Sequence, residues 1–304
     1  MSYQFLHPHV LNKDMIAIIG FFDGIHLAHQ ALLDQALKWA NEAKKKPVVI
    51  TFDVHPKSVI FGLEKAYITP LNQKVKYLLK AGFEAVYVIE FNLEKSRIKA
   101  EEFIHEYLSD LFGLVCGFDF KFGHGGLGDV HLLKAQTSFE TRVLDEIRHH
   151  HQKISSSVIQ DLISEGKCEE VTSLLGRYYS IEGEVIHGEK KGRLIGYPTA
   201  NLDTNGFLIP KKGVYATYTK VKDVLYPSMT SIGHNPTLNT HHPLSVESYL
   251  FDFNETIYGD LIETYFVKRL RSEMKFEAVQ DLIHQIDQDG VDTLAVLKTH
   301  QKPL

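Results

Sequence analysis

The sequence predicts an α/β domain with a doubly wound parallel sheet over residues 1–176, then a small antiparallel β-barrel domain with a C-terminal helix over residues 177–304. The 304 residues are enough for two domains of ordinary size. In the first half, short β-rich apolar runs alternate with longer stretches of helical period. In the second half, short apolar runs are separated by Gly, Pro and Asn, which is typical of a small barrel.

The first domain alternates strands and helices. Strands are expected at residues 15–22, 48–52, 85–89 and 114–118. Helices are expected at residues 30–45, 71–80 and 100–111. Alternation of this kind is typical of a parallel sheet covered by helices, and such sheets bind ligands outside the carboxyl ends of their strands.

The second domain changes pattern after one or two short helices at residues 155–175. Strands are expected at residues 180–186, 213–221, 226–231, 246–253 and 261–267. A final helix at residues 276–289 would close the barrel.

The composition indicates a folded globular protein, with 44% hydrophobic and 11% aromatic residues. The 38 acidic and 33 basic residues give a formal charge of -5, so we expect neither a nucleic-acid partner nor a membrane partner. The amino terminus lacks the layout of a signal peptide, and no apolar run approaches the ~18 residues of a membrane span, so a cytoplasmic location is expected. Nothing in the sequence indicates the oligomeric state.

The first candidate site follows the first strand, where Asp23 and Gly24 lead directly into a helix. His26 and His29 lie at the start of this helix, three residues apart, and therefore share one face. A helix start presents free N–H groups and partial positive charge, so two imidazoles there are suited to nucleotide phosphates and to nucleotidyl transfer. Chance helical histidines or a metal-binding pair would give the same spacing.

Other polar residues follow later strands at the same predicted edge. His55 lies after the second strand, and Asp119 and Phe122 lie in a glycine-rich segment that follows a later one. We expect these residues either to contact the ligand or to stabilise their own loops. Ser155 and Ser156 lie at a probable helix start, which suits both a helix cap and a phosphate cradle.

The second candidate site combines a glycine-punctuated basic loop with a short polar turn. Thr199 and Asn201, two residues apart, present a hydroxyl and an amide oxygen that together suit one Mg²⁺ ion. The alternative is a turn stabilised by its own side chains. Glu247 is the first acidic residue of a later strand and is suited to take a proton from an alcohol. Arg271, before the last helix, would pair with Glu273 or Asp260 or contact a flat polar ligand.

In its first half, the chain resembles the FMN adenylyltransferase module of the bacterial bifunctional riboflavin kinase/FAD synthetases. The matching segments are 22–29, 51–56, 117–129 and 154–157. The resemblance implies that ATP is bound by Phe22, Asp23, Gly24, His26, His29, Ser155 and Ser156. It assigns catalysis to His26 and His29, and flavin contacts or loop roles to His55, Asp119 and Phe122.

In its second half, the chain resembles the riboflavin kinase module of the same family nearly from end to end. The matching segments are 196–201, 213–215, 231–237, 258–259 and 270–276, together with Glu247. The resemblance implies that ATP is bound by Gly188, Lys191, Gly196, Pro198, Thr199 and Asn201. It implies Mg²⁺ at Thr199 and Asn201, Glu247 as the base for the riboflavin 5′-hydroxyl, and flavin contacts from Arg271, Glu273 and Phe276.

The sequence departs from the family pattern at three phosphate-handling positions. Ala28 replaces a glycine, and Gly126 and Gln160 stand where arginines are usual. Each lost charge-assisted hydrogen bond is worth about 1.5–3 kcal/mol. We therefore expect adenylyl transfer to be weak or changed in its requirements unless Lys57, Lys121 or Lys153 substitutes. In the barrel, Tyr249 replaces a common histidine.

These patterns favour an enzyme that phosphorylates riboflavin to FMN and adenylylates FMN to FAD, with ATP as co-substrate and Mg²⁺ as metal. One alternative is a riboflavin kinase whose first domain is a degenerate transferase. A second alternative is a non-catalytic flavin sensor. The retention of Thr199, Asn201 and Glu247 disfavours the sensor.

Overall fold

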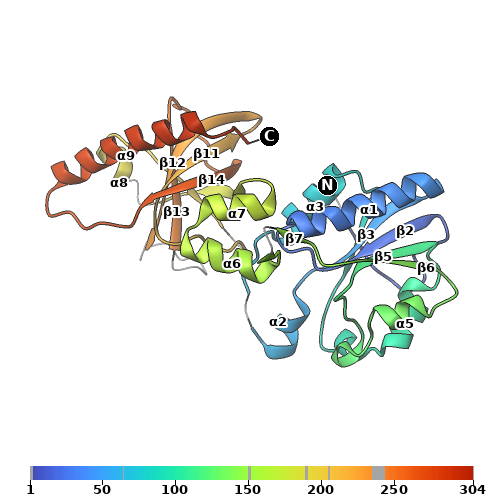
Figure 1. Ribbon diagram of the computed structural model, residues 1–304. Helices are drawn as coiled ribbons and strands as arrows, with labels where there is room; N and C mark the ends of the chain where they lie inside the picture. Colours follow the sequence, from blue (N-terminus) through green and yellow to red (C-terminus); the bar gives the residue numbers. More distant parts are fainter. Residues whose placement is uncertain are drawn as a thin grey trace. The chain divides into compact units, whose positions relative to one another are not determined.

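The structure, a computed structural model, describes residues 3–63, 65–149, 152–188, 191–204, 206–234 and 244–303. The chain divides into two compact units, Met1–Ser155 and Ser156–Leu304 (Figure 1). This division falls about 20 residues before the boundary at 176/177 that the sequence predicts, because two helices, α6 (Ser156–Glu165) and α7 (Cys168–Leu175), belong to the second unit. The domain boundary at 176/177 itself stays a prediction.

The first unit is built on a parallel sheet, as the sequence predicts. Among its described residues, six strands pair in the order β1-β4-β3-β2-β5-β6. They are β1 (Gln4–Phe5), β2 (Met15–Ile19), β3 (Lys46–Phe52), β4 (Ala85–Ile89), β5 (Gly113–Gly117) and β6 (Glu140–Leu144). A short antiparallel pair follows, β7 (Arg148–His149) and β8 (Gln152–Lys153). The strand order changes direction at β2, so the carboxyl end of β2 is the expected ligand position.

Helices cover both faces of this sheet, with α1 and α3 on one side and α5 on the other (Figure 1). The α-helices are α1 (Leu27–Ala43), α2 (Pro56–Phe61), α3 (Leu71–Lys80), α4 (Ala100–Phe103) and α5 (Val130–Lys134). Shorter turns are η1 (Lys95–Arg97), the π-helical η2 (Ile104–Leu108) and η3 (His124–Gly126).

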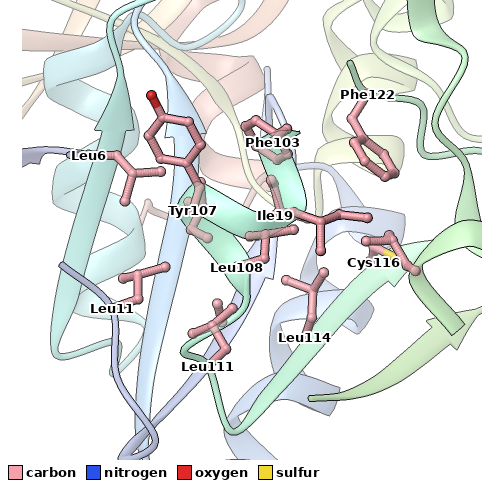
Figure 2. Packing of buried hydrophobic residues seen from close by; sticks show 14 of the residues in the cluster. Leu6, Leu11, Ile19, Phe103, Tyr107, Leu108, Leu111, Leu114, Cys116 and Phe122 are labelled. Atoms are coloured by element: carbon pink, nitrogen blue, oxygen red, sulfur yellow. The ribbon is translucent and has the colours of Figure 1, made fainter. Parts of the chain in front are cut away.

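Alternate side chains of β2 pack into two separate hydrophobic cores, one on each face of the sheet. Ile16 and Ile18 pack with Trp39 of α1, whereas Ala17 and Ile19 pack on the other face with residues of α4 and η2. Figure 2 shows this second cluster, in which aliphatic and aromatic side chains from β5, η2 and the glycine-rich loop meet. Both faces of the strand are buried, as expected for a central parallel strand.

The second unit contains a closed antiparallel barrel, which the sequence also predicts. Within the described residues, the strand order around it is β10-β13-β12-β11-β14-β9. The strands are β9 (Tyr179–Ile186), β10 (Ala200–Leu202), β11 (Gly213–Val221), β12 (Val224–His234), β13 (Leu244–Leu250) and β14 (Leu261–Arg271). Two helices accompany them, α8 (Lys191–Leu194) and α9 (Val279–Thr299), and α9 packs against β11, β12 and β14 (Figure 1).

Helix α9 begins three residues later and ends ten residues later than the sequence predicts. The helix continues past the predicted end at Asp289 and through Gly290. Its later turns bring Leu297 into a cluster with Ala216, Tyr218 and Val267 of the barrel. Burial of this apolar face therefore outweighs the low helix propensity of one glycine.

Hydroxyl groups form a connected network inside the barrel. Six Thr and Ser side chains take part, all fully buried: Thr217, Thr219, Ser228, Thr230, Ser248 and Thr264. Thr217 Oγ1 is 2.8 Å from both Ser228 Oγ and Thr230 Oγ1. Buried hydroxyls need such partners, because an unsatisfied one loses its hydration without compensation.

The substitution Thr217→Val should lower the free energy of unfolding of the second unit by about 1–3 kcal/mol, because it leaves Ser228 and Thr230 short of a partner. Thr217→Ser, which keeps the hydroxyl and removes one methyl group, should be less destabilising. Denaturant unfolding of the full chain, followed by near-ultraviolet circular dichroism, measures both. Equal destabilisation by the two variants would show that packing rather than hydrogen bonding matters here.

Candidate functional site

In the first unit, the loop between β2 and α1 is bent sharply and largely buried. Phe22 and Ile25 both adopt positive φ values, 55° and 41°, and Gly24 has a φ of 83°. Asp23 is 3% exposed, and its Oδ1 accepts a hydrogen bond from the Thr69 backbone N–H at 3.0 Å. The chain then enters α1 with His26 as its N-cap. This path brings the predicted residues 22–26 to the carboxyl end of β2.

His26 and His29 lie together at the start of α1. Their rings stack with centroids 3.6 Å apart, and His26 Nδ1 accepts the His29 backbone N–H at 3.3 Å. An accepting Nδ1 places the proton of the neutral ring on Nε2. Burial, first of all, and the neighbouring His26 and Lys74 hold the pKa of His29 well below its usual value. His29 Nδ1 is buried and makes no hydrogen bond within the described part of the chain.

His55 lies on the neighbouring loop, after β3. It caps α2, and its Nδ1 accepts the Lys57 backbone N–H at 3.1 Å, so its Nε2 carries the proton in the neutral form. Burial, with smaller effects of Lys65, Lys57 and Lys74, lowers the pKa of His55 to about 4. Both loops therefore present a histidine with a lowered pKa, His29 and His55, at one edge of the sheet.

These low pKa values predict a pH dependence of stability. An unfolded histidine binds a proton near pH 6.5 and the folded His55 only near pH 4, so stability is present above pH 6.5 and is lost as the pH falls toward 4. We expect a lower denaturation midpoint of the first unit at pH 5 than at pH 7. His55→Asn, which keeps a capping side chain, should reduce this difference. An unchanged difference would show that His55 is not responsible.

The remaining transferase candidates are more dispersed. Asp119 is exposed and lies 3.3 Å from Lys153 Nζ. Phe122 is 7% exposed and packs in the core beside Phe103 (Figure 2). Ser155 ends the first unit and Ser156 begins α6 in the second. The roles that the sequence predicts for these four residues stay predictions.

In the second unit, Thr199, Asn201 and Glu247 come together. Asn201 of β10 pairs directly with Glu247 of β13, so the two side chains lie on the same face of the barrel wall. Thr199 Oγ1 donates a hydrogen bond to Glu247 Oε2 at 3.2 Å, and Ser245 Oγ donates to Glu247 Oε1 at 3.3 Å. Thr199 and Glu247, which are distant in the sequence, are therefore in direct contact.

A small pocket of about 10 Å³ lies at this point. Its lining residues are Gly188, Arg193, Pro198, Thr199, Asn201 and Tyr258. Four of the six are residues that the sequence predicts for the ATP site. Gly188 must lack a side chain, because a Cβ there would collide with the Asn201 amide. Gly196 has a φ of 92°, a conformation that favours glycine, and it turns the chain toward Pro198.

Arg193 and Tyr258 line the pocket without having been predicted. Arg193 belongs to the basic loop, and Tyr258 belongs to segment 258–259, which matches the riboflavin kinase module. Both residues could therefore have been predicted for the site from the sequence. Lys191 begins α8, and its side chain lies outside the described part of the structure, as does the segment 235–237.

The same residues fit a magnesium ion chemically. Asn201 Oδ1 is buried and makes no hydrogen bond with any described residue. The Thr199 hydroxyl and the Glu247 carboxylate add two further oxygens beside it. Mg²⁺ is usually held by a few oxygens of this kind, together with water and substrate phosphates.

Arg271, at the end of β14, forms an ion pair with Asp289 of α9 instead of Glu273 or Asp260. The guanidinium binds the carboxylate at 2.6–3.0 Å through Nε and Nη2, and Asp289 is almost fully buried. Glu273 is exposed, and its carboxylate lies against Gly233. Phe276 is half-buried in the segment before α9. The predicted flavin contacts of these residues stay predictions.

Helix α9 also contacts the loop that carries Thr199. The Tyr197 hydroxyl donates a hydrogen bond to Asp287 Oδ1, and this bond is the main cause that raises the pKa of Tyr197 to about 12. The Tyr197 ring packs edge-on against Tyr249, with centroids 5.3 Å apart. Tyr249, which replaces the common histidine, therefore points toward the loop of the site.

Family models match both units, "FAD synthetase" over residues 9–158 and "Riboflavin kinase" over residues 175–297. The bifunctional riboflavin kinase/FMN adenylyltransferase of Listeria monocytogenes is 40% identical over 94% of this chain and 92% of its own length. The chain belongs to the bifunctional riboflavin kinase/FMN adenylyltransferase family.

A second family member and a solved structure also match nearly the full length of the chain. The Bacillus subtilis enzyme is 35% identical over 97% of this chain and 98% of its own length. A Streptococcus pneumoniae crystal structure, described as a macrolide-efflux protein, has a TM-score of 0.83 and 31% identity, and the match covers 94% of this chain and 95% of that one. None of the described helices of the present chain combines the length and apolar character needed to cross a bilayer.

Proposed function

We propose that this chain uses ATP to phosphorylate riboflavin to FMN in the second unit and to adenylylate FMN to FAD in the first. The observation that carries the proposal is that Thr199 and Asn201, which line the small pocket, lie beside Glu247. The presence of both family matches in one chain supports the bifunctional reading rather than a degenerate transferase or a flavin sensor.

In the kinase reaction, Glu247 is the group that takes the proton of the riboflavin 5′-hydroxyl. Thr199 and Ser245 each donate a hydrogen bond to a different oxygen of its carboxylate, which orients the group. Asn201 and Thr199 would hold Mg²⁺, which when bound supplies charge neutralisation for the phosphates. Arg193 adds a cation at the rim of the pocket.

In the adenylyl-transfer reaction, His26 and His29 contact the ATP phosphates. Because His26 Nδ1 accepts a hydrogen bond, the proton of the neutral ring lies on Nε2, the nitrogen that would donate to phosphate oxygens. Such donors, fixed before the substrate arrives, stabilise the charge that builds on the α-phosphate during transfer. Attack of an FMN phosphate oxygen on that phosphorus releases pyrophosphate.

A product analysis tests both halves. Purified protein is incubated with Mg-ATP and either riboflavin or FMN, and the flavins are separated by chromatography. We expect FMN and then FAD from riboflavin, and FAD from FMN. FMN without FAD would leave only the kinase, and no product with retained flavin binding would favour a sensor. A parallel FMN incubation with reduced flavin tests whether Ala28, Gly126 and Gln160 restrict the accepted redox state.

A further inference from the structure

The described part of the first unit contains a lysine buried to an unusual degree, which the sequence does not single out. Lys74 of α3 is 1% exposed, and its ammonium lies behind the loops that carry the histidines. Lysine is almost never buried to this extent without partners, because the charged form loses its hydration.

The partners of Lys74 are backbone carbonyls at the ends of two adjacent strands. Its Nζ donates to Phe21 O at 2.9 Å, after β2, and to Phe52 O at 3.2 Å, at the end of β3. The ammonium also lies 4.3 Å from the centroid of the Phe21 ring. One side chain therefore joins the two loops at their origin.

Phe21 links Lys74 to the histidines. Its ring packs edge-on against His55 with centroids 4.8 Å apart, and the next residues of its loop lead to His26. Thr51 Oγ1 donates to the same Phe21 carbonyl at 3.2 Å. A shift of Phe21 would move the His55 ring and the start of α1 together.

The charged and titratable groups around Lys74 come from four segments. Asp23 follows β2 and Asp53 follows β3, and both favour the ammonium form, although burial is the larger effect and lowers the pKa of Lys74 to about 7. His29 of α1 and His55 at the cap of α2 feel its charge, which helps to keep both imidazoles neutral.

We infer that Lys74 is a positioning residue of the adenylyl-transfer site: its ammonium ties the β2 and β3 loops together and thereby positions His26, His29 and His55. The inference rests on the proposed adenylyl transfer. Nothing in the kinase unit depends on it, so riboflavin phosphorylation by the same chain is an internal control.

The test compares Lys74→Met with Lys80→Met in the full chain. Methionine has a similar length without charge, and Lys80 is the exposed last residue of the same helix. We expect Lys74→Met to lower kcat for FAD formation by roughly 10–100-fold, because small displacements of catalytic groups have effects of this size. KM values, riboflavin phosphorylation and the denaturation midpoint of the first unit should change little, and Lys80→Met should match the wild type.

A structural role alone would give a different pattern. Lys74→Met would then lower the denaturation midpoint, and the FAD-forming activity of the folded fraction would remain near the wild-type value. That result, or FAD formation within about threefold of wild type, would overturn the inference. If the wild-type protein forms no FAD, the proposed adenylyl transfer itself is wrong. This outcome differs from one in which the wild type forms FAD and Lys74→Met forms it equally well, which overturns only the inference about Lys74.

A second measurement needs no variant. Because Lys74 loses its proton near pH 7 in the free protein, kcat/KM for FAD formation by the wild type should fall between pH 6.5 and 8.5. Riboflavin phosphorylation, which shares ATP, corrects for titration of the nucleotide. A profile for FAD formation that parallels the kinase profile over this range would overturn the inference.

Discussion

Replacing Glu247 with glutamine should lower kcat for riboflavin phosphorylation by roughly 10²–10⁴-fold, the usual contribution of a general base. Glutamine keeps the size of the side chain and can still accept the Thr199 hydrogen bond, but it cannot take a proton from the flavin hydroxyl. The KM for ATP should change much less. Steady-state formation of FMN, measured by chromatography, gives both constants.

Two controls make this result specific. Glu255→Gln changes an exposed carboxylate in the loop after β13 and should leave both activities unaltered. FAD formation from FMN by Glu247→Gln should equal that of the wild type, because His26 and His29 lie in the other unit. A kinase rate within tenfold of the wild type would assign the base to another residue.

The fold was largely predictable because each unit has a strong local pattern. The limits of α3, β4 and β11 agree with the prediction to the residue. The shortest elements, such as β1 and β10, were missed because two or three residues carry no periodicity, and only tertiary pairing defines them. The end of α9 was misplaced because the barrel surface that Leu297 covers cannot be recognised in the local sequence.

The candidate site was predictable only where one short segment holds the chemistry. Thr199 and Asn201 share a turn, and Glu247 is the first acidic residue of a later strand. By contrast, Lys74 lies in an ordinary amphipathic helix, and its role depends on two carbonyls contributed by other segments. The Arg271–Asp289 and Tyr197–Asp287 pairs depend on how α9 crosses the barrel, which the sequence does not specify.

His26 is the residue whose replacement should affect FAD formation most. Its ring caps α1 through Nδ1, and in the neutral ring the proton lies on Nε2, which we propose contacts phosphate. His26→Asn separates the two functions, because asparagine is a good N-cap but lacks a group at the Nε2 position. Loss of one fixed donor at the reacting phosphate typically lowers kcat by roughly 10²–10³-fold. We expect a loss of this size in FAD formation, measured with FMN and Mg-ATP.

The stability of the variant decides between a catalytic role and a capping role. With the cap kept, the free energy of unfolding of the first unit should fall by less than about 1 kcal/mol. His131→Asn, which changes an exposed histidine in the first turn of α5, is the matched control and should keep full activity. If His26→Asn instead formed FAD at the wild-type rate, the phosphate contacts would have to come from His29 and the helix N-terminus alone. In that case, His26 would serve only as the N-cap of α1, and the stacked His26 and His29 would not act as a catalytic pair.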